Sequence, residues 1–471
     1  MISFRVDIYQ LEIRKDRAKP YGARWRVETS YKRRSFKTRG LAENFRSDLM
    51  QAARKGEGFD TETGLPESMT KKDEEVVTAY AIALAYTKMK WSGAAAKTRR
   101  GTAQALATVM PTLVPDGTPA YPAPDTLREA LISYAFNPPR RDEDQPGEIA
   151  AALEWMRENS LPLEFLNDVA KRPDLVRGAL DACAAKLDGK PAAAATMRRK
   201  RAVLFNYFGY AVERGHLTVN PVTTVQWKVE KVAEEVDRRV VLSPARFDHC
   251  LTGVTYCGHE RGMKLRAFFA LLFYASARPA EALALLESDL DLPEKGWGEV
   301  IFARSEPEAG SGWTDDGSAN DSRGLKWRAR SESRPVPIPP ICVRVLRDHI
   351  ARYKIAAGAP LFRTATGNRY TQKAYNVIWQ EARGYGLPPK LAATPMGQRP
   401  YDLRHGGVTL WLNSGVPVPE VARRAGHSPD VLLKIYAGCI DDGTASANAK
   451  IERALGGDAP TEAGEKGDSA A

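Results

Sequence analysis

The period of the apolar residues changes twice along the chain, and this change constrains the fold more than any other sequence feature. Residues 1–65 begin with short runs in which apolar and polar residues alternate, as in strands, and continue into a helix-like run that stops at Gly56. Residues 66–228 then follow the helical period almost throughout, whereas residues 244–455 mix helical and strand-like segments. A chain of 471 residues is too long for one compact core, so we expect several domains.

These patterns predict a multidomain protein that is mostly α-helical with small β-sheets. Residues 1–65 are expected to form a β-sheet backed by one helix, residues 66–228 an all-α domain, and residues 244–455 a mixed α+β domain. The highly charged stretch 229–243 is the expected linker between the last two domains. Residues 456–471 lack large apolar side chains and are expected to be disordered.

The charge balance of the chain is basic. Lys and Arg number 69 against 58 Asp and Glu, a net charge of +11, which favours a polyanionic partner, nucleic acid first, over acidic or neutral ones. Residues 1–65 alone hold 15 Lys and Arg against 9 acidic residues. A basic two-stranded ribbon can enter the major groove of DNA, although a solvated basic face is the alternative.

Three clusters of basic residues are the candidate DNA contacts. One cluster lies on the expected N-terminal sheet, and two lie at the starts of helices, where they can reach backbone phosphates or simply remain solvated. The clusters comprise Arg24, Arg26, Lys32, Arg33 and Arg34 in the sheet, Lys97, Arg99 and Arg100 in one helix, and Arg198, Arg199, Lys200 and Arg201 in another.

Hydrophobicity and cysteine content favour a cytoplasmic, nucleoid-associated protein without a membrane partner. The first twenty residues hold no apolar run of the secretory kind, and no stretch approaches the roughly 18 consecutive apolar residues that a membrane helix needs. The five cysteines are few and scattered, which fits a reducing compartment. Buried thiols are expected rather than a metal or cofactor site, because no common zinc spacing is matched by His249, Cys250, Cys257 and His259.

Four short motifs in the last part of the chain carry the chemistry. Arg278 follows a long apolar run, an unusual place for a solvated arginine, although a surface salt bridge with Glu281 at i+3 is the alternative. The other motifs are Leu325-Lys326-Trp327 ahead of Arg334-Pro335-Val336-Pro337-Ile338, Tyr401-Asp402-Leu403-Arg404-His405, and Gly426-His427-Ser428 followed by Tyr436. Each motif alone is weak, but in this order and spacing they resemble the catalytic domain of the tyrosine recombinases, the phage-type site-specific integrases.

This resemblance implies a domain plan and a reaction. Residues 1–65 would bind arm-type DNA sites, residues 66–228 would form the core-binding domain, and residues 244–455 the catalytic domain. The family breaks and rejoins DNA through a 3′-phosphotyrosyl intermediate without metal or ATP. The implied partners are double-stranded DNA attachment sites, a homotetramer on DNA, and a directionality factor or host DNA-bending protein. The implied function is integration, and also excision, of a phage or other mobile element.

The resemblance also assigns site residues. Tyr436 is the implied nucleophile, Arg278 and Arg404 match the two family arginines, Lys326 matches the general acid, and His427 is an implied phosphate donor. The arginine roles agree with the chemistry, because attack on a phosphodiester builds negative charge that a permanently charged, forked guanidinium binds well. The basic neighbours of Lys326 compete with it for the acid role, but the spacing to the following strand favours Lys326 over Arg323, Arg328, Arg330 and Arg334.

One position departs from the family pattern. Tyr401 stands where the family usually has His, three residues before Arg404. A phenol donates a hydrogen bond but is a poor proton acceptor near pH 7, so Tyr401 is expected either to donate to the scissile phosphate or to pack its ring beneath Arg404. His405 is catalytic or structural. The Gly-, Ser- and Asp-rich segment 308–323 is expected to be a long flexible hairpin loop that orders only on DNA.

Other functions remain compatible with these motifs. A DNA-binding regulator can keep the fold without cutting DNA, and a relaxing topoisomerase can use the same tyrosine chemistry. A metal-dependent transposase is disfavoured, because no carboxylate triad accompanies the motifs.

Overall fold

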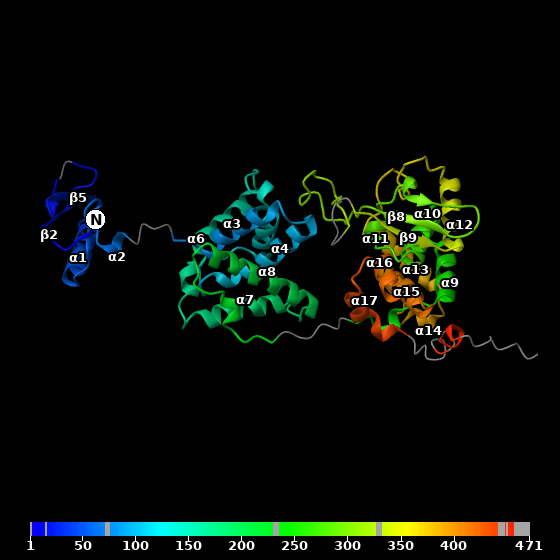
Figure 1. Ribbon diagram of the computed structural model, residues 1–471. Helices are drawn as coiled ribbons and strands as arrows, with labels where there is room; N and C mark the ends of the chain where they lie inside the picture. Colours follow the sequence, from blue (N-terminus) through cyan, green and yellow to red (C-terminus); the bar gives the residue numbers. More distant parts are fainter. Residues whose placement is uncertain are drawn as a thin grey trace, which may run out of the picture.

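The computed structural model describes residues 2–14, 17–70, 76–228, 235–325, 332–440, 448 and 451–455. Within these residues three hydrophobic cores follow one another along the chain, and Figure 1 shows the corresponding bodies in sequence order. We name them the N-terminal unit (2–70), the helical unit (76–228) and the C-terminal unit (235–440). Helices dominate, and the sheets are small and antiparallel. The predicted fold class, a mostly α-helical multidomain protein with small β-sheets, is confirmed.

Some predictions fall outside the described residues. These are the general-acid candidate Lys326, the first part of the linker (229–234) and the tail 456–471. The remainder of the predicted linker packs on the C-terminal unit, where the Val236 amide donates to the Ile435 carbonyl (2.8 Å) and Leu242 is buried. Among the helices that the structure describes, none combines the length and the apolar character needed to cross a bilayer.

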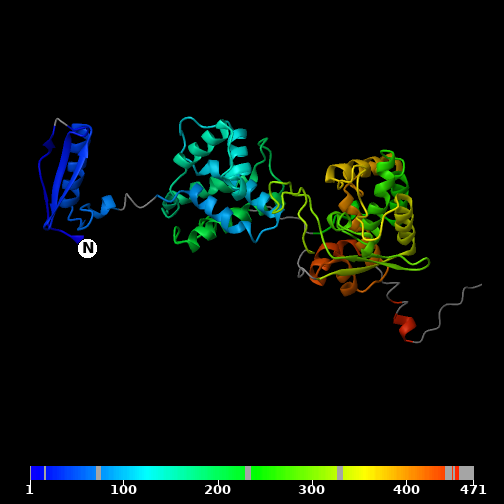
Figure 2. The same cartoon turned by 90° about the horizontal axis from the view of Figure 1, so that it is seen from above.

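The N-terminal unit is a four-stranded sheet covered by one helix. The strands of this sheet are β2 (Val6–Ile8), β3 (Glu12–Ile13), β4 (Tyr21–Val27) and β5 (Ser30–Phe36), and the helix is α1 (Arg39–Arg54). A separate strand pair, β1 (Ile2–Ser3) and β6 (Phe59–Asp60), and the short helix α2 (Glu67–Thr70) complete the unit. β4 pairs with β5 on one edge and with β2 and β3 on the other, while β1 pairs with β6. Alternation along β4 buries Trp25 and Val27 with Leu49 of α1, so Arg24 and Arg26 lie on the opposite, open face. Figure 2 shows α1 along one face of this sheet.

Helices packed around one apolar core form the helical unit. They are α3 (Ala79–Trp91), α4 (Ala96–Val109), α5 (Pro124–Ala130), α6 (Gly147–Asn159), α7 (Arg172–Ala184) and α8 (Ala194–Glu213), joined by short turns. α3 begins at Thr78, whose hydroxyl accepts a hydrogen bond from the Ala81 amide (3.1 Å). α8 buries Tyr207, and the hydroxyl of Tyr207 donates to the Ala79 carbonyl (2.8 Å). This bond fixes the start of α3 against α8.

The C-terminal unit surrounds one apolar helix, α10, which contacts α9, α12, α13 and α15. Its elements are α9 (Pro244–Val254), α10 (Glu260–Tyr274), α11 (Pro279–Ala282), β7 (Leu290–Asp291), β8 (Gly298–Phe302), β9 (Arg334–Ile338), α12 (Pro340–Tyr353), α13 (Gln372–Gly386), α14 (Pro389–Ala392), α15 (Pro400–Asn413), α16 (Val418–Ala425) and α17 (Pro429–Tyr436). The three strands form an antiparallel sheet in the order β7-β8-β9.

Two glycines let α15 approach α10 closely. A Cβ atom at Gly407 would lie 2.0 Å from the carbonyl oxygen of Phe273, and one at Gly406 would lie 2.8 Å from the Phe273 ring. Any larger residue would therefore push the two helices apart. The approach matters for the site, because Arg404 lies three residues earlier on α15 and Ser276 lies just after α10.

The segment between β8 and β9 differs from its prediction. We name residues 303–325 the strap. Instead of a flexible loop, the strap is folded, with antiparallel bridges between Ser305 and Arg323 and between Glu308 and Asn320. It reaches from the C-terminal unit to the helical unit in Figures 1 and 2, where Trp313 is buried in the core of the helical unit. The predicted hairpin is therefore confirmed, but the prediction that it orders only on DNA is not supported, because the segment packs on the protein itself.

Candidate active site

Most of the predicted catalytic side chains meet at one place in the C-terminal unit. Arg278 lies just before α11, Arg404 lies in α15, and His427 lies in the turn between α16 and α17. Tyr436 ends α17, and Tyr401 joins from the first turn of α15. The sequence motifs thus converge in space although almost 160 residues separate the first from the last.

Arg404 is completely buried and is held by hydrogen bonds inside the C-terminal unit. Its guanidinium donates to the carbonyl oxygens of Ser276 and Ala425 and to Nε2 of His427, the last at 2.8 Å. Burial lowers the pKa of Arg404, and the neighbouring Arg278 lowers it further, yet an arginine keeps its charge in proteins. A fixed buried charge whose hydrogen-bond acceptors are neutral suits the binding of an anion.

Glu281 is a buried carboxylate shared by two arginines. Its Oε1 accepts from Arg278 (2.6 Å), and its Oε2 accepts from Arg334 of β9 (2.6 Å). Burial raises the pKa of Glu281, but Arg334 and Arg278 lower it more strongly, to about 2. The salt bridge that we considered as a surface alternative for Arg278 therefore exists, but it is buried and forms part of the site.

The cluster carries an excess of positive charge. Arg278, Arg334 and Arg404 surround the single carboxylate Glu281. The side chain of Arg278 remains 21% exposed, whereas that of Arg334 is 1% exposed. Arg278 can therefore meet an incoming anion, while Arg334 holds Glu281 from inside.

Tyr436 is a buried phenol in contact with an imidazole. Its hydroxyl lies 2.9 Å from Nδ1 of His405, the residue after Arg404. Burial raises the pKa of Tyr436, while Arg404 and Arg278 lower it. Burial also lowers the pKa of His405 to about 4, so this ring is neutral near pH 7 and its unprotonated nitrogen can accept the phenol proton. The structure brings His405, which the sequence left open between two roles, against the nucleophile candidate.

His427 is held in a tight turn. Gly426 before it has a φ of 66°, which favours glycine, and the hydroxyl of Ser428 after it caps α17 by accepting from the Val431 amide (3.3 Å). Burial and the nearby arginines lower the pKa of His427 to about 3. Because Nε2 accepts from Arg404, the proton of the neutral ring lies on Nδ1, which is buried and has no partner within the described residues.

Tyr401 does not pack as one of its two expected arrangements requires, and its donation to the scissile phosphate stays a prediction. Its ring packs edge-on against His405, with centroids 5.3 Å apart, rather than beneath Arg404. Its side chain lines the same cavity as Arg278, and the residue is 38% exposed. Tyr401 thus lies beside both the exposed arginine and the histidine that meets Tyr436.

Sequence reasoning missed the part of Arg334 and Glu281 in the site. From the sequence, Arg334 was considered only as an alternative to Lys326 for the general acid. Glu281 was considered only as the partner of Arg278 in a surface ion pair. A usable signal was present, since Arg334 shares its strand face with the core residues Val336 and Ile338. An arginine on a buried strand face needs an anion, and Glu281 is that anion.

The basic residues of the N-terminal sheet divide between its two faces. Arg24 pairs with Arg33 across β4 and β5, and both share the open face with Arg26. Lys32 instead donates to a backbone carbonyl after β6, and Arg34 lies over a phenylalanine ring of α1. The open face therefore presents three of the five predicted arginines and lysines.

In the helical unit, Arg99 does not fit its predicted role. Its side chain is 4% exposed and is paired with Asp315 of the strap, so it is not free to contact DNA. Lys97 and Arg100 beside it are exposed. At the start of α8, Arg198 and Arg199 are exposed, whereas Lys200 and Arg201 are half-buried.

All five cysteines are buried and unpaired, as expected for buried thiols. Burial raises the pKa of the Cys250 thiol to about 11. In the parts of the chain that the structure describes, no three or more His, Cys, Asp or Glu side chains are grouped so that they could hold a metal ion.

Comparison with known proteins gives one curated relative. No family model matches the chain. A protein described as "tyrosine recombinase XerC-like" from Caldanaerobacter subterraneus subsp. tengcongensis is 25% identical over 252 residues, which are 50% of this chain and 59% of the relative. The match thus spans about three fifths of the relative's length. The sequence-based prediction of a resemblance to the tyrosine recombinases is confirmed.

The solved structures that match the chain have low sequence identity to it. The Tn1549 transposon integrase in complex with circular intermediate DNA is 18% identical, with a TM-score of 0.44 over 68% of this chain and 98% of that chain. The XerH recombinase bound to difH is 12% identical, with a TM-score of 0.45 over 80% and 98%. A lambda integrase dimer bound to a core site is 14% identical, with a TM-score of 0.41 over 98% and 97%.

Proposed function

We propose that this chain, as a member of the tyrosine recombinase family, is a site-specific DNA recombinase that breaks and rejoins DNA through a 3′-phosphotyrosyl intermediate. The observation that carries the proposal is the buried contact between the Tyr436 hydroxyl and Nδ1 of His405 (2.9 Å), beside Arg278 and Arg404. A phenol next to a neutral imidazole and an excess of positive charge is arranged to attack an anion.

In the proposed first step, the Tyr436 oxygen attacks the scissile phosphorus and its proton passes to Nδ1 of His405. The bond from phosphorus to the 5′-oxygen breaks, and that oxygen takes a proton from Lys326 and leaves as a hydroxyl. Arg278 and Arg404 bind the non-bridging oxygens, where negative charge builds. Rejoining reverses these steps, so the energy of the phosphodiester is kept in the phosphotyrosine and no ATP is consumed.

His405 is assigned as the base because Tyr401 stands in the place of the usual histidine. A phenol at position 401 cannot replace the usual histidine as a proton acceptor near pH 7. His405 is buried, neutral and in contact with Tyr436, which supports it in that role. Tyr401 then acts from the cavity that it lines together with Arg278.

The proposal extends to the partners of the chain. The substrate is double-stranded DNA carrying attachment sites, which the open face of Arg24, Arg26 and Arg33 and the net charge of +11 support. Strand exchange takes place in a homotetramer on DNA in the cytoplasm, with a directionality factor or a host DNA-bending protein as further partners. The reaction integrates a mobile element and also excises it.

A nicked duplex that traps the covalent intermediate tests this function. The duplex is built from the junction of the element, mapped by sequencing the DNA that flanks the gene. Wild-type protein should give a covalent band on a denaturing gel, and Tyr436→Phe should bind the duplex equally well but give no band, because only the attacking oxygen is lost. Tyr401→Phe is the matched control, since it removes the other hydroxyl of the site and should keep the band.

Two results would overturn the proposal. A wild-type protein that binds the junction duplex but forms no adduct would be a DNA-binding regulator. An adduct that persists in Tyr436→Phe would assign the nucleophile to another residue. The thermal unfolding temperature of each variant shows whether the variant is folded.

A further inference from the structure

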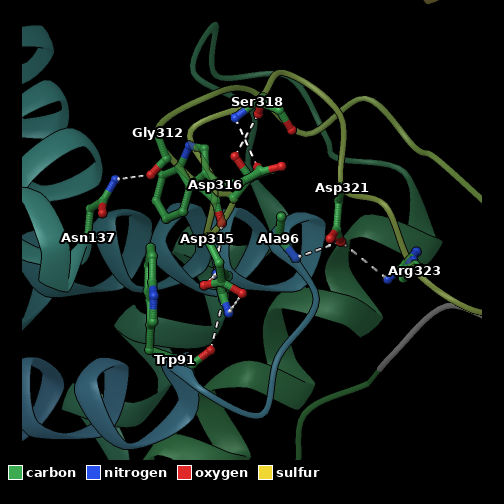
Figure 3. Close-up of polar contacts among 12 residues, drawn as sticks. Trp91, Ala96, Asn137, Gly312, Asp315, Asp316, Ser318, Asp321 and Arg323 are labelled. Atoms are coloured by element: carbon green, nitrogen blue, oxygen red, sulfur yellow. Dashed lines mark hydrogen bonds and ion pairs between the residues drawn. The ribbon is translucent and has the colours of Figure 1, made fainter. Parts of the chain in front are cut away.

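A buried tryptophan of the strap packs in the core of the helical unit. Trp313 is 8% exposed and belongs to the core of the helical unit, although it comes from the C-terminal half of the chain. Its ring lies 6.0 Å from that of Trp91 at the end of α3. The carbonyl of Gly312 accepts from the side-chain amide of Asn137 (2.8 Å), a contact that Figure 3 shows beside Trp91.

Arg99 of α4 holds the Trp313 segment of the strap in place. Its guanidinium lies over the Trp91 ring (4.6 Å to the centroid) and donates to the carbonyls of Trp91 (2.8 Å) and Trp313 (3.0 Å). The same group donates to both carboxylate oxygens of Asp315, at 2.6 and 3.1 Å. Asp315 is 78% exposed, so the buried tryptophan and the carbonyl bonds outweigh the ion pair in holding the strap.

A second contact ties the strap to the first turn of α4. The carboxylate of Asp321 accepts from the backbone amide of Ala96 (3.1 Å), as Figure 3 shows. Further along the same helix, Arg100 donates to the carbonyl of Ala309 (3.4 Å). Lys97 lies between these two contact points in the sequence and is exposed.

The other end of the strap reaches the active site. The amide of Glu306 donates to the carbonyl of Ala280 in α11 (3.1 Å), next to Arg278. Lys97 and Arg278 line one cavity of about 500 Å³, together with Arg323 of the strap and Tyr401 of α15. A cation of the helical unit therefore shares a cavity with the exposed arginine of the active site, and the strap spans the distance between them.

We propose that the strap is a docking element that brings Lys97 to the cavity of Arg278, so that the helical unit contributes a phosphate contact to the site only while Trp313 is seated. This inference rests on the proposed function, because the phosphate is that of the DNA strand being cut. Undocking would expose Trp313 and leave the buried Arg99 without the Trp313 carbonyl and the Asp315 carboxylate as acceptors, so the docked state is favoured. In this proposal Lys97 binds the phosphate, and its contact depends on the docking of the strap, which belongs to the C-terminal unit.

Hydrogen exchange of the full-length protein without DNA tests the docking itself. Backbone amides between residues 309 and 321 should be protected in the wild type and should lose protection at least tenfold in Trp313→Ala, with little change in the cores of the three units. Trp297→Ala is the matched control, because Trp297 precedes β8 and is 58% exposed, and it should leave the strap protected. An unprotected strap in the wild type would overturn the docking. Protection that disappears on dilution would place the docking between two copies of the chain, which would also overturn it.

A double-variant cycle tests the link to Lys97. Single-turnover cleavage of the nicked duplex should fall about tenfold in Lys97→Gln, as expected for one lost hydrogen bond to a charged group, and by a similar factor in Trp313→Ala. The double variant should lose no more than either single variant, since Lys97 reaches the cavity only when the strap is seated. Lys190→Gln, which removes an exposed lysine elsewhere in the helical unit, should cleave like the wild type.

Additive losses in the double variant would show that Lys97 and the strap act independently, which would overturn the proposal. A wild type that fails to cleave would contradict the proposed function instead, and the hydrogen-exchange result would still decide whether the strap docks.

Discussion

Arg99 and Arg404 are both buried arginines, but their partners differ. Arg99 lies over the Trp91 ring, donates to the Trp313 carbonyl, and is paired with Asp315, for which the structure shows no other cationic partner among the described residues. Arg404 donates to two carbonyls and a neutral histidine. The carboxylate near Arg404, Glu281, is already shared by two other arginines.

The difference separates an arginine that holds structure from one that is available for chemistry. A buried arginine with its own carboxylate is satisfied, and removing it frees the segment that it fastens. A buried arginine in a cluster with more cations than carboxylates is satisfied fully only when an anion enters. The four predictions below test this distinction in order of decreasing effect.

The largest effect is expected for Arg404→Ala compared with Arg99→Ala. Loss of one charge-stabilising donor typically lowers the rate by about 10²–10³, so Arg404→Ala should slow single-turnover cleavage by this factor while DNA affinity changes little. Arg99→Ala should slow cleavage about tenfold, through the strap, as expected for one lost charged contact. Equal rate losses in the two variants, measured on the same nicked duplex, would remove the distinction.

The shared carboxylate gives the second prediction, which concerns stability. Removing one partner of a buried ion pair costs about 3–5 kcal/mol, so Glu281→Gln should lower the free energy of unfolding of the C-terminal unit by this order. The pKa of Glu281 is lowered from 4.5 to about 2. Its contribution is therefore complete above pH 4.5 and is lost as the pH falls toward 2.

Urea unfolding at several pH values measures this effect. The wild type should lose more stability than Glu281→Gln as the pH falls from about 4.5 toward 2, because the variant lacks the carboxylate that becomes protonated. Parallel losses in the two proteins would mean that Glu281 is not the group responsible.

The third prediction uses the neutral histidine beside the nucleophile. Because burial lowers the pKa of His405 from 6.5 to about 4, the base stays unprotonated well below pH 6.5. The cleavage rate should therefore stay level from pH 8 to about 5.5 and fall only as the pH approaches 4. A midpoint near the ordinary histidine value of 6.5 would exclude His405 as the base, and His405→Gln should abolish the dependence together with most of the rate.

The smallest effect is expected at Tyr401, which touches the cluster from its exposed side. Tyr401→Phe removes a hydroxyl from the cavity that Arg278 lines. The loss of one hydrogen bond to a charged group costs about 1.5–3 kcal/mol, so the variant should slow cleavage about tenfold or somewhat more. Tyr401→His should retain most of the rate, since an imidazole can make the same contact. A silent Tyr401→Phe would show that only the packing of its ring on His405 matters.

The fold class and the convergence of the motifs could be predicted from the sequence. Alternation in residues 1–40 and the helical period after residue 66 reflect local burial, which a single chain reveals directly. The motif residues Arg278, Arg404, His427 and Tyr436 were found through a family resemblance, and the structure brings them together. Their catalytic roles and that of Lys326 remain predictions.

Other features depend on long-range contacts and could not be predicted. Arg99 looked like a solvated helix start, since nothing near it in the sequence announces that Asp315, more than 200 residues later, is its partner. The strap looked flexible because its Gly-, Ser- and Asp-rich composition is typical of loops, whereas Trp313 within it packs in the core of the helical unit. Arg334 was the exception, because the alternation of its strand already placed it inside.

The close approach of α15 to α10 has a consequence for any survey of functional variants. Gly407 lies in contact with the backbone of Phe273, one helical turn after Arg404, and every side chain larger than hydrogen would displace the helix that carries Arg404. In a saturation library selected for recombination, Gly407 should therefore tolerate as few replacements as Tyr436. Selection for activity alone would score the two positions alike. A parallel measurement of the amount of folded protein would distinguish them, because replacements of Gly407 disturb helix packing whereas replacements of Tyr436 remove the nucleophile.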